Sequence, residues 1–114
     1  MTLCVQEGPV ILIGYEYRLQ LEAVADLFPE GAVFAGQLRS AIVATSVLAA
    51  LSTTAGSILR LDERTLEIIL TPAVTSSLVP GGVVLDLVRT DLTPDRHLGF
   101  LLEIPVVLPV TRGL

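Results

Sequence analysis

Residues 66–91 read LEIILTPAVTSSLVPGGVVLDLVRTD, a segment in which two strand patterns are joined through one helical turn and a glycine corner. The first pattern places apolar residues at every second position, at Leu66, Ile68 and Leu70. Thr71 is suited to cap a helix, because its hydroxyl accepts a backbone N–H bond, and Pro72 is suited to the first turn, because it has no N–H to leave unpaired. A short helical turn near residues 72–78 is therefore predicted.

The rest of this segment reverses the chain and begins another strand. Pro80 ends the helical turn, and the two glycines after it allow the backbone to turn. In the following VVLDLVRT, one face of the alternation is apolar up to a basic rim, at Val83, Leu85, Leu87 and then Arg89. Two alternating strands joined by so short a helix predict an all-β fold.

Alternation of the same kind recurs along the chain. It is clearest over residues 15–22, where Tyr15, Tyr17, Leu19 and Leu21 alternate with polar residues. Further strands are predicted over residues 33–39, 57–61, 65–70, 83–90 and 97–103. Residues 41–54 suit strand or helix, and strand is preferred for most of them. About seven short strands separated by Gly- and Pro-containing turns predict an antiparallel β-sandwich of immunoglobulin-like character.

Length and proline placement predict the organisation of the chain. A chain of 114 residues has the size of one domain. Residues 1–9 show no periodicity and are expected to form an N-terminal arm, followed by a single sandwich domain over residues 10–114. The last segment, residues 104–114, is expected at a sheet edge, at a bulge or in an arm that leaves the domain, because Pro105 and Pro109 cannot donate to a strand ladder.

The composition predicts that other protein chains cover part of the surface. Hydrophobic residues make up 52% of the sequence and charged residues only 17%, against about 25% charged in ordinary domains. A membrane span is not expected, because the weakly polar run over residues 41–51 is interrupted by Thr45 and Ser46 and is shorter than the roughly 20 residues required. Residues 1–8 lack a basic start and contain Glu7, so a secretory signal is not expected.

Charge and cysteine usage exclude further classes. The chain has 12 acidic and 7 basic residues, a net charge of −5. Binding to nucleic acid requires clustered positive charge, so no nucleic-acid partner is expected. Cys4 is the only cysteine, which rules out an intrachain disulfide and fits a reducing compartment such as the bacterial cytoplasm.

The residues that usually carry catalysis or bind metals are sparse. His97 is the only histidine, and no third group at a recognisable spacing orients it toward Cys4. Because His97 follows a polar turn, we expect a solvated side chain at the end of a loop. The sequence has neither a Cys/His set for zinc nor an aspartate-rich calcium loop. No catalytic residue, cofactor or metal is predicted, and an enzyme is not expected.

The acidic residues are interpreted mainly as turn residues. This applies to Asp62, Glu63, Asp91 and Asp95, which lie in turn-forming segments. Asp86 is different, because it interrupts an apolar strand. It is expected either to face solvent or to pair with an arginine such as Arg39 or Arg112.

Several of these residues carry a resemblance to a known family. They are Thr71, Thr75, Leu78, the Pro80-Gly81-Gly82 corner, Asp86-Leu87 and the closing Val110-Thr111-Arg112. In this pattern the chain resembles a family of small β-sandwich domains encoded among the virion genes of tailed bacteriophages and prophages. The likeness is clearest over the last half, with only a loose similarity in residues 15–24 and 36–39. The family often has tyrosine before Asp-Leu, where this chain has Val84-Leu85.

The resemblance implies a structural part of a virion. The preferred expectation is a capsid decoration or cement protein that binds between shell subunits and stabilises the head. The alternative is a baseplate or tail-fibre anchoring protein. Implied partners are the major capsid protein or other virion proteins and further copies of the chain, with a homotrimer favoured. The implied location is the virion, assembled in the cytoplasm of the bacterial host. A small enzyme or ligand-binding sandwich ranks last, because no polar constellation supports it.

Terminal segments are the expected contact regions. The prolines and the surplus of hydrophobic residues suggest that residues 1–9 and 104–114 contact neighbouring subunits. The expected interface residues are Leu3, Val5, Val106, Val107, Leu108 and Arg112.

Overall fold

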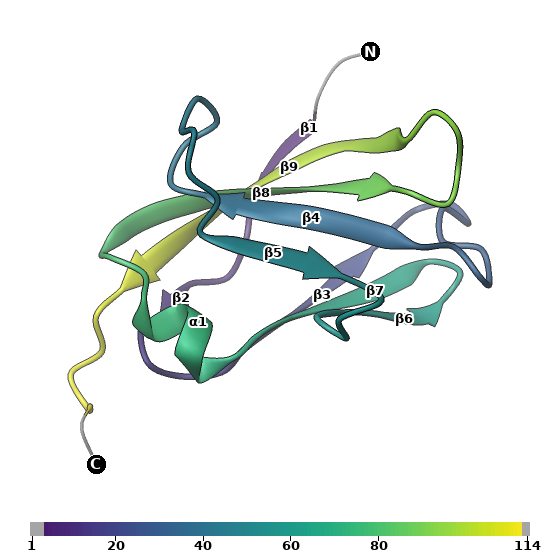
Figure 1. Cartoon of the computed structure of the whole chain (residues 1–114). Coiled ribbons are helices and arrows are strands. Elements are labelled where there is room, and N and C mark those ends of the chain that lie inside the picture. The colour runs from purple at the N-terminus through teal and green to yellow at the C-terminus, as the bar shows by residue number, and fades with distance from the viewer. Residues whose placement is uncertain (1–3, 113–114) are drawn as a thin grey trace.

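The computed structural model describes the backbone of residues 4–112 and the side chains of residues 8–112. Nine strands and one short helix form this part of the chain (Figure 1). The elements are β1 (Cys4–Glu7), β2 (Ile11–Leu12), β3 (Tyr17–Glu22), β4 (Phe34–Arg39), β5 (Ala49–Ser52), β6 (Ile58–Asp62), β7 (Thr65–Leu70), α1 (Pro72–Ser76), β8 (Gly81–Arg89) and β9 (Arg96–Val107). The predicted all-β sandwich is confirmed, while its immunoglobulin-like character stays a prediction.

The strands form two sheets that pack as layers. The larger sheet has the order β1-β9-β8-β4-β5, with β2 also paired to β9, and the smaller has the order β3-β7-β6. Figure 1 shows the larger sheet above the smaller one, with α1 at one end. All pairs are antiparallel except β1 with β9 and β2 with β9, which are parallel. The larger sheet is therefore mixed at one edge, where the sequence patterns predicted antiparallel pairing throughout.

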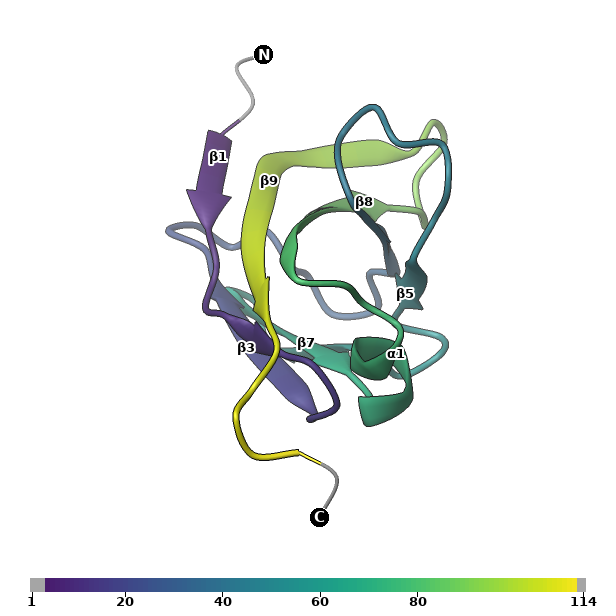
Figure 2. The same ribbon diagram turned by 90° about the vertical axis from the view of Figure 1, so that its left-hand side faces the viewer.

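β9 turns a corner that closes one side of the sandwich. Figure 2 shows it running along the upper layer and then descending beside β1. Its register with β8 shifts, since Asp86 is opposite Leu101 while Val88 is opposite His97, so that a step of two residues on β8 matches a step of four on β9. Gly99 lies in this bulge at φ +86°, a conformation that L side chains rarely adopt. Bulges bend strands, and this one accompanies the corner.

The core lies between the two layers and follows the predicted alternation. The largest fully buried side chains come from β2, β4, β6, β7, β8 and β9 and from the loop before β4: Ile11, Phe28, Phe34, Leu38, Ile58, Leu66, Ile68, Leu70, Leu85, Leu87, Ile104 and Val106. Phe28 and Phe34 meet edge to face with ring centroids 5.5 Å apart, a favoured aromatic geometry. The inward faces predicted for residues 33–39, 65–70 and 83–90 are thereby confirmed. For residues 15–22 the prediction is confirmed at Tyr17 and Leu19, which are buried, but is wrong at Tyr15, which lies before β3 and is exposed.

Two expectations about the chain's segments are wrong. Most of residues 41–54 was predicted to be strand, but only Ala49–Ser52 forms one. Ile42 and Val43 are 65% and 89% exposed, and such β-branched residues favour strands only where a sheet surface packs against them. Residues 1–9 were expected to lack regular structure, yet Cys4–Glu7 pairs with Phe100–Glu103 as β1.

Pro105 lies inside the sheet rather than in a departing arm. β9 continues to Val107, with β8 on one side and the two short strands β1 and β2 on the other. The N–H of Gly8 donates to the carbonyl of Glu103 (2.9 Å), so the backbone of Pro105, two residues on, faces the same side. Residues 8–10 interrupt the pairing there. The missing N–H of Pro105 therefore falls at the break between β1 and β2.

Thr71 and Thr75 organise the helical turn as the sequence indicates. Thr71 is the N-cap, with its hydroxyl accepting from the Val74 N–H, and Pro72 begins α1. Thr75 is completely buried. Its hydroxyl donates to the carbonyl of Tyr15 (2.9 Å) and accepts from the N–H of Gly14 (3.2 Å). The helix is thus attached to the turn before β3 through one side chain.

Replacing Thr75 by valine is expected to lower the free energy of unfolding by about 0.5–1.5 kcal/mol, because it removes the hydrogen bonds from the buried Thr75 hydroxyl to the backbone of Gly14 and Tyr15. Urea unfolding followed by circular dichroism measures the change. Thr75→Ser is the matched control, since it keeps the hydroxyl and loses only a methyl group. Equal loss in both variants would assign the effect to packing rather than to these hydrogen bonds.

Candidate interaction surface

The residues predicted as an interface do not come together on one exposed surface. Leu3 and the side chain of Val5 lie outside the described residues; the backbone of Val5 is in β1, opposite Leu101. Val106 is only 2% exposed and belongs to the core, because it alternates with the outward-facing Val107. Val107 and Leu108 are 45% and 47% exposed. Of the predicted interface residues with described side chains, Val107, Leu108 and Arg112 are exposed. The guanidinium of Arg112 donates to the Pro109 carbonyl.

An exposed apolar patch does surround Val107. Leu12 on β2 is its direct partner across the strands, and Val10 faces the same way as Leu12 because Ile11 between them is buried. We define the C-terminal patch as Val10, Leu12, Val107 and Leu108, each about half exposed, between 42% and 47%. The prolines of residues 104–114 led the sequence analysis to predict Val107 and Leu108 as contact residues. Val10 and Leu12 were missed, because they join the patch through the parallel pairing of β2 with β9, which the local sequence does not indicate.

A broad groove lies beside this patch on the larger sheet. Its volume is about 650 Å³, and we call it the outer groove. It is lined by Ser40, Ala41, Ile42, Val43, Gly82, Val83, Val84, Glu103, Ile104 and Pro105. Pro105 lines the groove and Val107 follows two residues later with the same facing, so that groove and patch form one largely apolar surface. Glu103 is the only ionisable residue in its lining.

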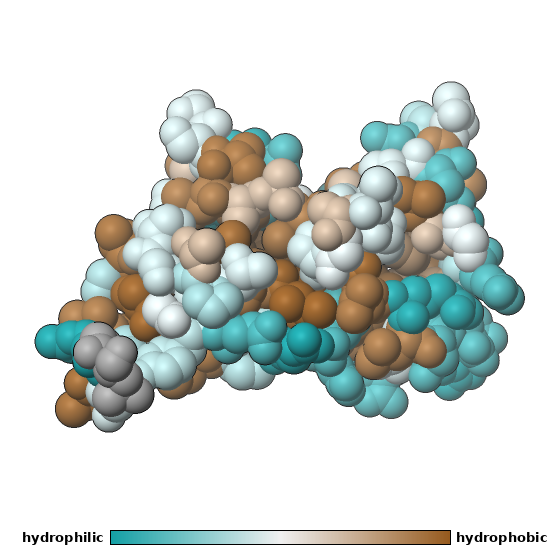
Figure 3. Space-filling model, turned by 60° about the horizontal axis from the view of Figure 1, so that its bottom comes forward, coloured by the Kyte–Doolittle hydropathy of each residue, from teal (hydrophilic) through white to brown (hydrophobic). Residues whose placement is uncertain are grey.

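Two projecting loops flank the larger sheet. Figure 1 shows the β4–β5 connection rising at one end and the β8–β9 connection at the other. The first carries Ile42 and Val43, whose exposed apolar side chains form one wall of the outer groove. Figure 3, with the lower side brought forward, shows hydrophobic side chains scattered over the molecule and a largely hydrophilic lower end on the right. Exposed hydrophobic residues are thus not confined to one strand or one loop.

The free edge of the larger sheet is a weaker candidate for contacts. Along β5, the backbone N–H of Ser52 donates to the hydroxyl of Ser57 (2.9 Å), and that hydroxyl is also within 3.3 Å of the Ser52 carbonyl. Ser57 therefore occupies the place that a neighbouring strand would take at this residue. Short, locally blocked edges of this kind resist strand addition.

Asp86 pairs with neither arginine that the sequence suggested. Its Oδ2 lies 2.8 Å from Nε2 of His97. Arg39 instead donates to the Ala44 carbonyl and to Oε1 of Gln37. His97 was expected to be a solvated loop-end residue, but it lies in β9 with its side chain 38% exposed. The hairpin of β8 and β9 brings the two residues together across eleven positions.

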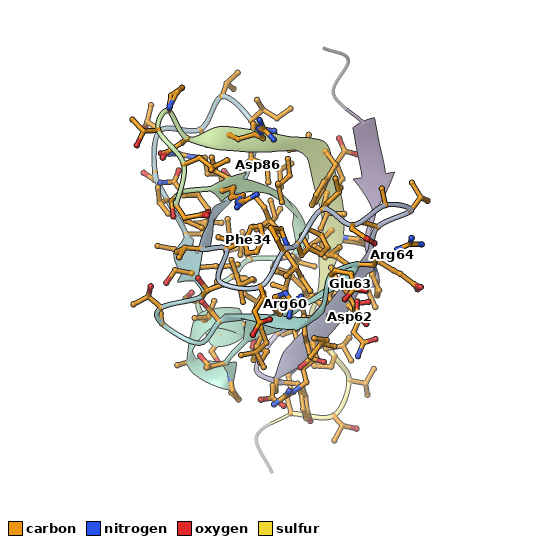
Figure 4. The ribbon with its side chains drawn as sticks, turned by 90° about the vertical axis from the view of Figure 1, so that its right-hand side faces the viewer. Phe34, Arg60, Asp62, Glu63, Arg64 and Asp86 are labelled. Carbon is orange, nitrogen blue, oxygen red and sulfur yellow. The ribbon has the colours of Figure 1, made fainter. Side chains whose placement is uncertain are left out.

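The remaining acidic residues largely act in turns, as predicted. Asp62 accepts from the N–H of Arg64 (2.8 Å), which lowers the pKa of its carboxyl group. Asp91 is bound by the guanidinium of Arg89 and by the N–H of Val33, and the arginine is the main cause that lowers its pKa to about 2. Figure 4 shows Asp62, Glu63 and Arg64 together at the β6–β7 turn, away from Asp86 on the other sheet.

Neither a metal site nor a membrane-spanning helix is present in the part of the chain that the structure describes. Among those residues, His, Cys, Asp and Glu side chains form no group of three or more that could hold a metal ion. The described residues also include no helix that is long and apolar enough to cross a membrane.

No family model matches the chain, and no curated protein matches it.

Proposed function

We propose that this chain is a structural protein of a tailed-bacteriophage virion that binds other virion proteins through the outer groove and the C-terminal patch, most plainly as a capsid decoration or cement protein. The resemblance over Thr71, Thr75, Leu78, the glycine corner and Asp86-Leu87 supports the virion assignment. The observation that carries the binding role is the exposure of Ile42 and Val43 in the outer groove, together with Pro105 in its lining and the exposed Val107 two residues further along β9. Exposed apolar residues gathered in this way are typical of protein–protein contacts.

The surface accounts for how such a protein stabilises a shell. Fully burying a valine or leucine side chain contributes about 1.5–3 kcal/mol, so covering each half-exposed residue of the C-terminal patch contributes about 1 kcal/mol. A protein that binds only the assembled shell shifts the equilibrium toward it by mass action. Neither catalysis nor a cofactor is part of this role. We propose that the chain acts as a homotrimer, which native mass spectrometry of the purified protein tests directly.

A matched pair of valines tests the surface. Val43 in the outer groove and Val24 in the β3–β4 connection are 89% and 98% exposed, and Val24 is not part of the groove lining. Val43→Asp is expected to weaken binding to purified phage particles at least tenfold, because the interface would bury an unpaired charge. Val24→Asp is expected to bind like the unaltered protein. Co-sedimentation with particles of the phage that encodes the chain measures both, and circular dichroism confirms that both variants fold.

The same particles distinguish the two virion roles. A gold label on the chain should appear over the head of intact particles if the chain decorates the capsid. A label confined to the tail tip would instead assign it to the baseplate or a fibre anchor. Equal binding of the two valine variants would reject the outer groove as the contact surface, and no association with particles would reject the virion role.

A further inference from the structure

Both ring nitrogens of His97 have hydrogen-bond partners on the larger sheet. Nε2 lies 2.8 Å from Oδ2 of Asp86 on β8, and the backbone N–H of Gly99 donates to Nδ1 at 2.8 Å. The imidazole thus connects the two strands at the bulge of β9. The side chains of His97 and Asp86 are 38% and 40% exposed, so protons exchange with solvent without unfolding of the protein.

These partners define where the proton of the neutral ring must lie. A backbone N–H can only donate, so Nδ1 must be the acceptor and carry no proton. The single proton of the neutral ring is then on Nε2, where it donates to the Asp86 carboxylate. Both hydrogen bonds are satisfied only in this neutral tautomer.

Protonation makes the two bonds incompatible. The imidazolium carries an N–H on both nitrogens. Its Nε2–H still donates to Asp86, now as a charge-assisted bond, but its Nδ1–H points at the N–H of Gly99, donor against donor at 2.8 Å. One of the two groups must move. Asp86 retains the ring, so the displaced group is the Gly99 amide.

The position of Gly99 gives this displacement a structural consequence. Gly99 lies within the bulge, between the His97–Val88 pair and the Leu101–Asp86 pair, and its φ of +86° is specific to this local geometry. The residues directly after it pair with β1. Release of its amide therefore loosens the bulge next to the corner of β9.

Other charged groups surround the pair but leave this competition in place. On β4, Arg39 lines a small hollow together with Asp86, and its guanidinium is bound to Gln37 and to the Ala44 carbonyl. From the β8–β9 connection, Asp95 lines another hollow that also includes Asp86. Asp86 is the charged group that contacts the ring itself.

We propose that His97 is a pH-dependent contact that holds the bulge of β9 closed when neutral and releases the Gly99 amide when protonated. The inference concerns the fold itself and does not depend on the virion role. It adds a local conformational change to a sandwich whose other described ion pairs join arginine to carboxylate.

Nuclear magnetic resonance of the full chain tests the proposal. His97 is the only histidine, so its ring ¹⁵N signals are unambiguous. At pH 8 they should show a protonated Nε2 and an unprotonated Nδ1. When the pH is lowered until the ring ¹⁵N signals show the imidazolium, the hydrogen-exchange protection of the Gly99 amide, corrected for the intrinsic rate, should fall at least tenfold. The protection of the Leu102 amide in the same strand should stay constant.

His97→Gln provides the second measurement, because glutamine does not titrate. In this variant, the protection of the Gly99 amide should be independent of pH over the same range. Asp86→Asn removes the carboxylate but leaves the donor conflict at Nδ1, so its Gly99 amide should still lose protection when His97 is protonated. A ring with the proton on Nδ1 at pH 8, or unchanged Gly99 protection across the titration, would overturn the proposal.

Discussion

Phe34→Ala is expected to lower the free energy of unfolding by about 3–5 kcal/mol, the usual loss when a buried phenylalanine is truncated. Phe34 begins β4 and is completely buried. Its ring meets that of Phe28, which comes from the β3–β4 connection, so truncation removes an aromatic pair as well as apolar burial. Guanidinium unfolding followed by circular dichroism measures the loss.

The size of this effect follows from the position of Phe34. The β4 strand lies between β8 and β5, so a cavity at Phe34 is enclosed by strands that cannot close around it without breaking their ladders. Domains of this size have total stabilities of about 5–15 kcal/mol, so the variant loses a large part of the total. Phe34→Leu is the control and should lose less than about 2 kcal/mol, because it keeps most of the volume. A loss below 1 kcal/mol in Phe34→Ala would show that Phe34 is not a central core residue.

Strand faces could be predicted from the sequence because alternation is a local property. In β8, Val83, Leu85 and Leu87 are buried as their spacing indicates, and the same reasoning places Phe34 and Leu38 in the core. The helix start could also be predicted, because the Thr71 cap and Pro72 act within one turn. Each of these features depends only on residues a few positions apart.

Features that depend on pairing between distant strands could not be predicted. β1 adds to β9 in parallel, joining residues almost a hundred positions apart, and no periodicity specifies such a partner. The burial of Val106 was also missed, because the continuation of β9 through Pro105 was not predicted. Once β9 is known to continue through Pro105, alternation places Val106 inward and Val107 outward, but the two prolines suggested that the strand had already ended.

The contact between His97 and Asp86 depends on the register of the β8–β9 hairpin. His97 lies opposite Val88 and therefore diagonally next to Asp86. The step of four residues on β9 against two on β8 then places Leu101, rather than Gly99, opposite Asp86. Gly99 marks the site in hindsight, because a glycine within a strand pattern often accompanies a bulge. A bulge at Gly99 was not predicted, and Asp86 was expected to face solvent or to pair with an arginine.

The outer groove depends both on residues close in sequence and on the pairing of distant strands. The projecting β4–β5 connection was mistaken for strand because Ile42 and Val43 are strand-forming residues. Their exposure instead makes them a wall of the groove. Part of the excess of hydrophobic residues in the composition thus lies at the loop tip, on the outward face of β9 and on the neighbouring β2. Other exposed hydrophobic residues, among them Val24, Leu61 and Val79, are spread over the rest of the surface.

Gly36→Val is expected to destabilise the fold by about 3 kcal/mol or more through overpacking between β4 and β8. A Cβ atom at Gly36 would lie 2.6 Å from Cδ2 of Leu87 and 2.7 Å from the backbone carbonyl oxygen of Asp86. The leucine side chain is completely buried in the core, so it can move away only by displacing other core side chains. The carbonyl belongs to the neighbouring strand, so relief of the clash requires β4 and β8 to separate.

Ala35→Val is the matched control, because it introduces the same side chain one position earlier in the same strand. Ala35 faces away from the core and lines an open hollow on the outer side of the larger sheet, so its free energy of unfolding should change by less than about 1 kcal/mol. Valine favours strand structure at both positions. A large difference in the free energy of unfolding between the two variants can therefore be assigned to the steric clash at residue 36. Comparable stability of the two variants would show that β8 lies further from Gly36 than the distance of 2.7 Å implies.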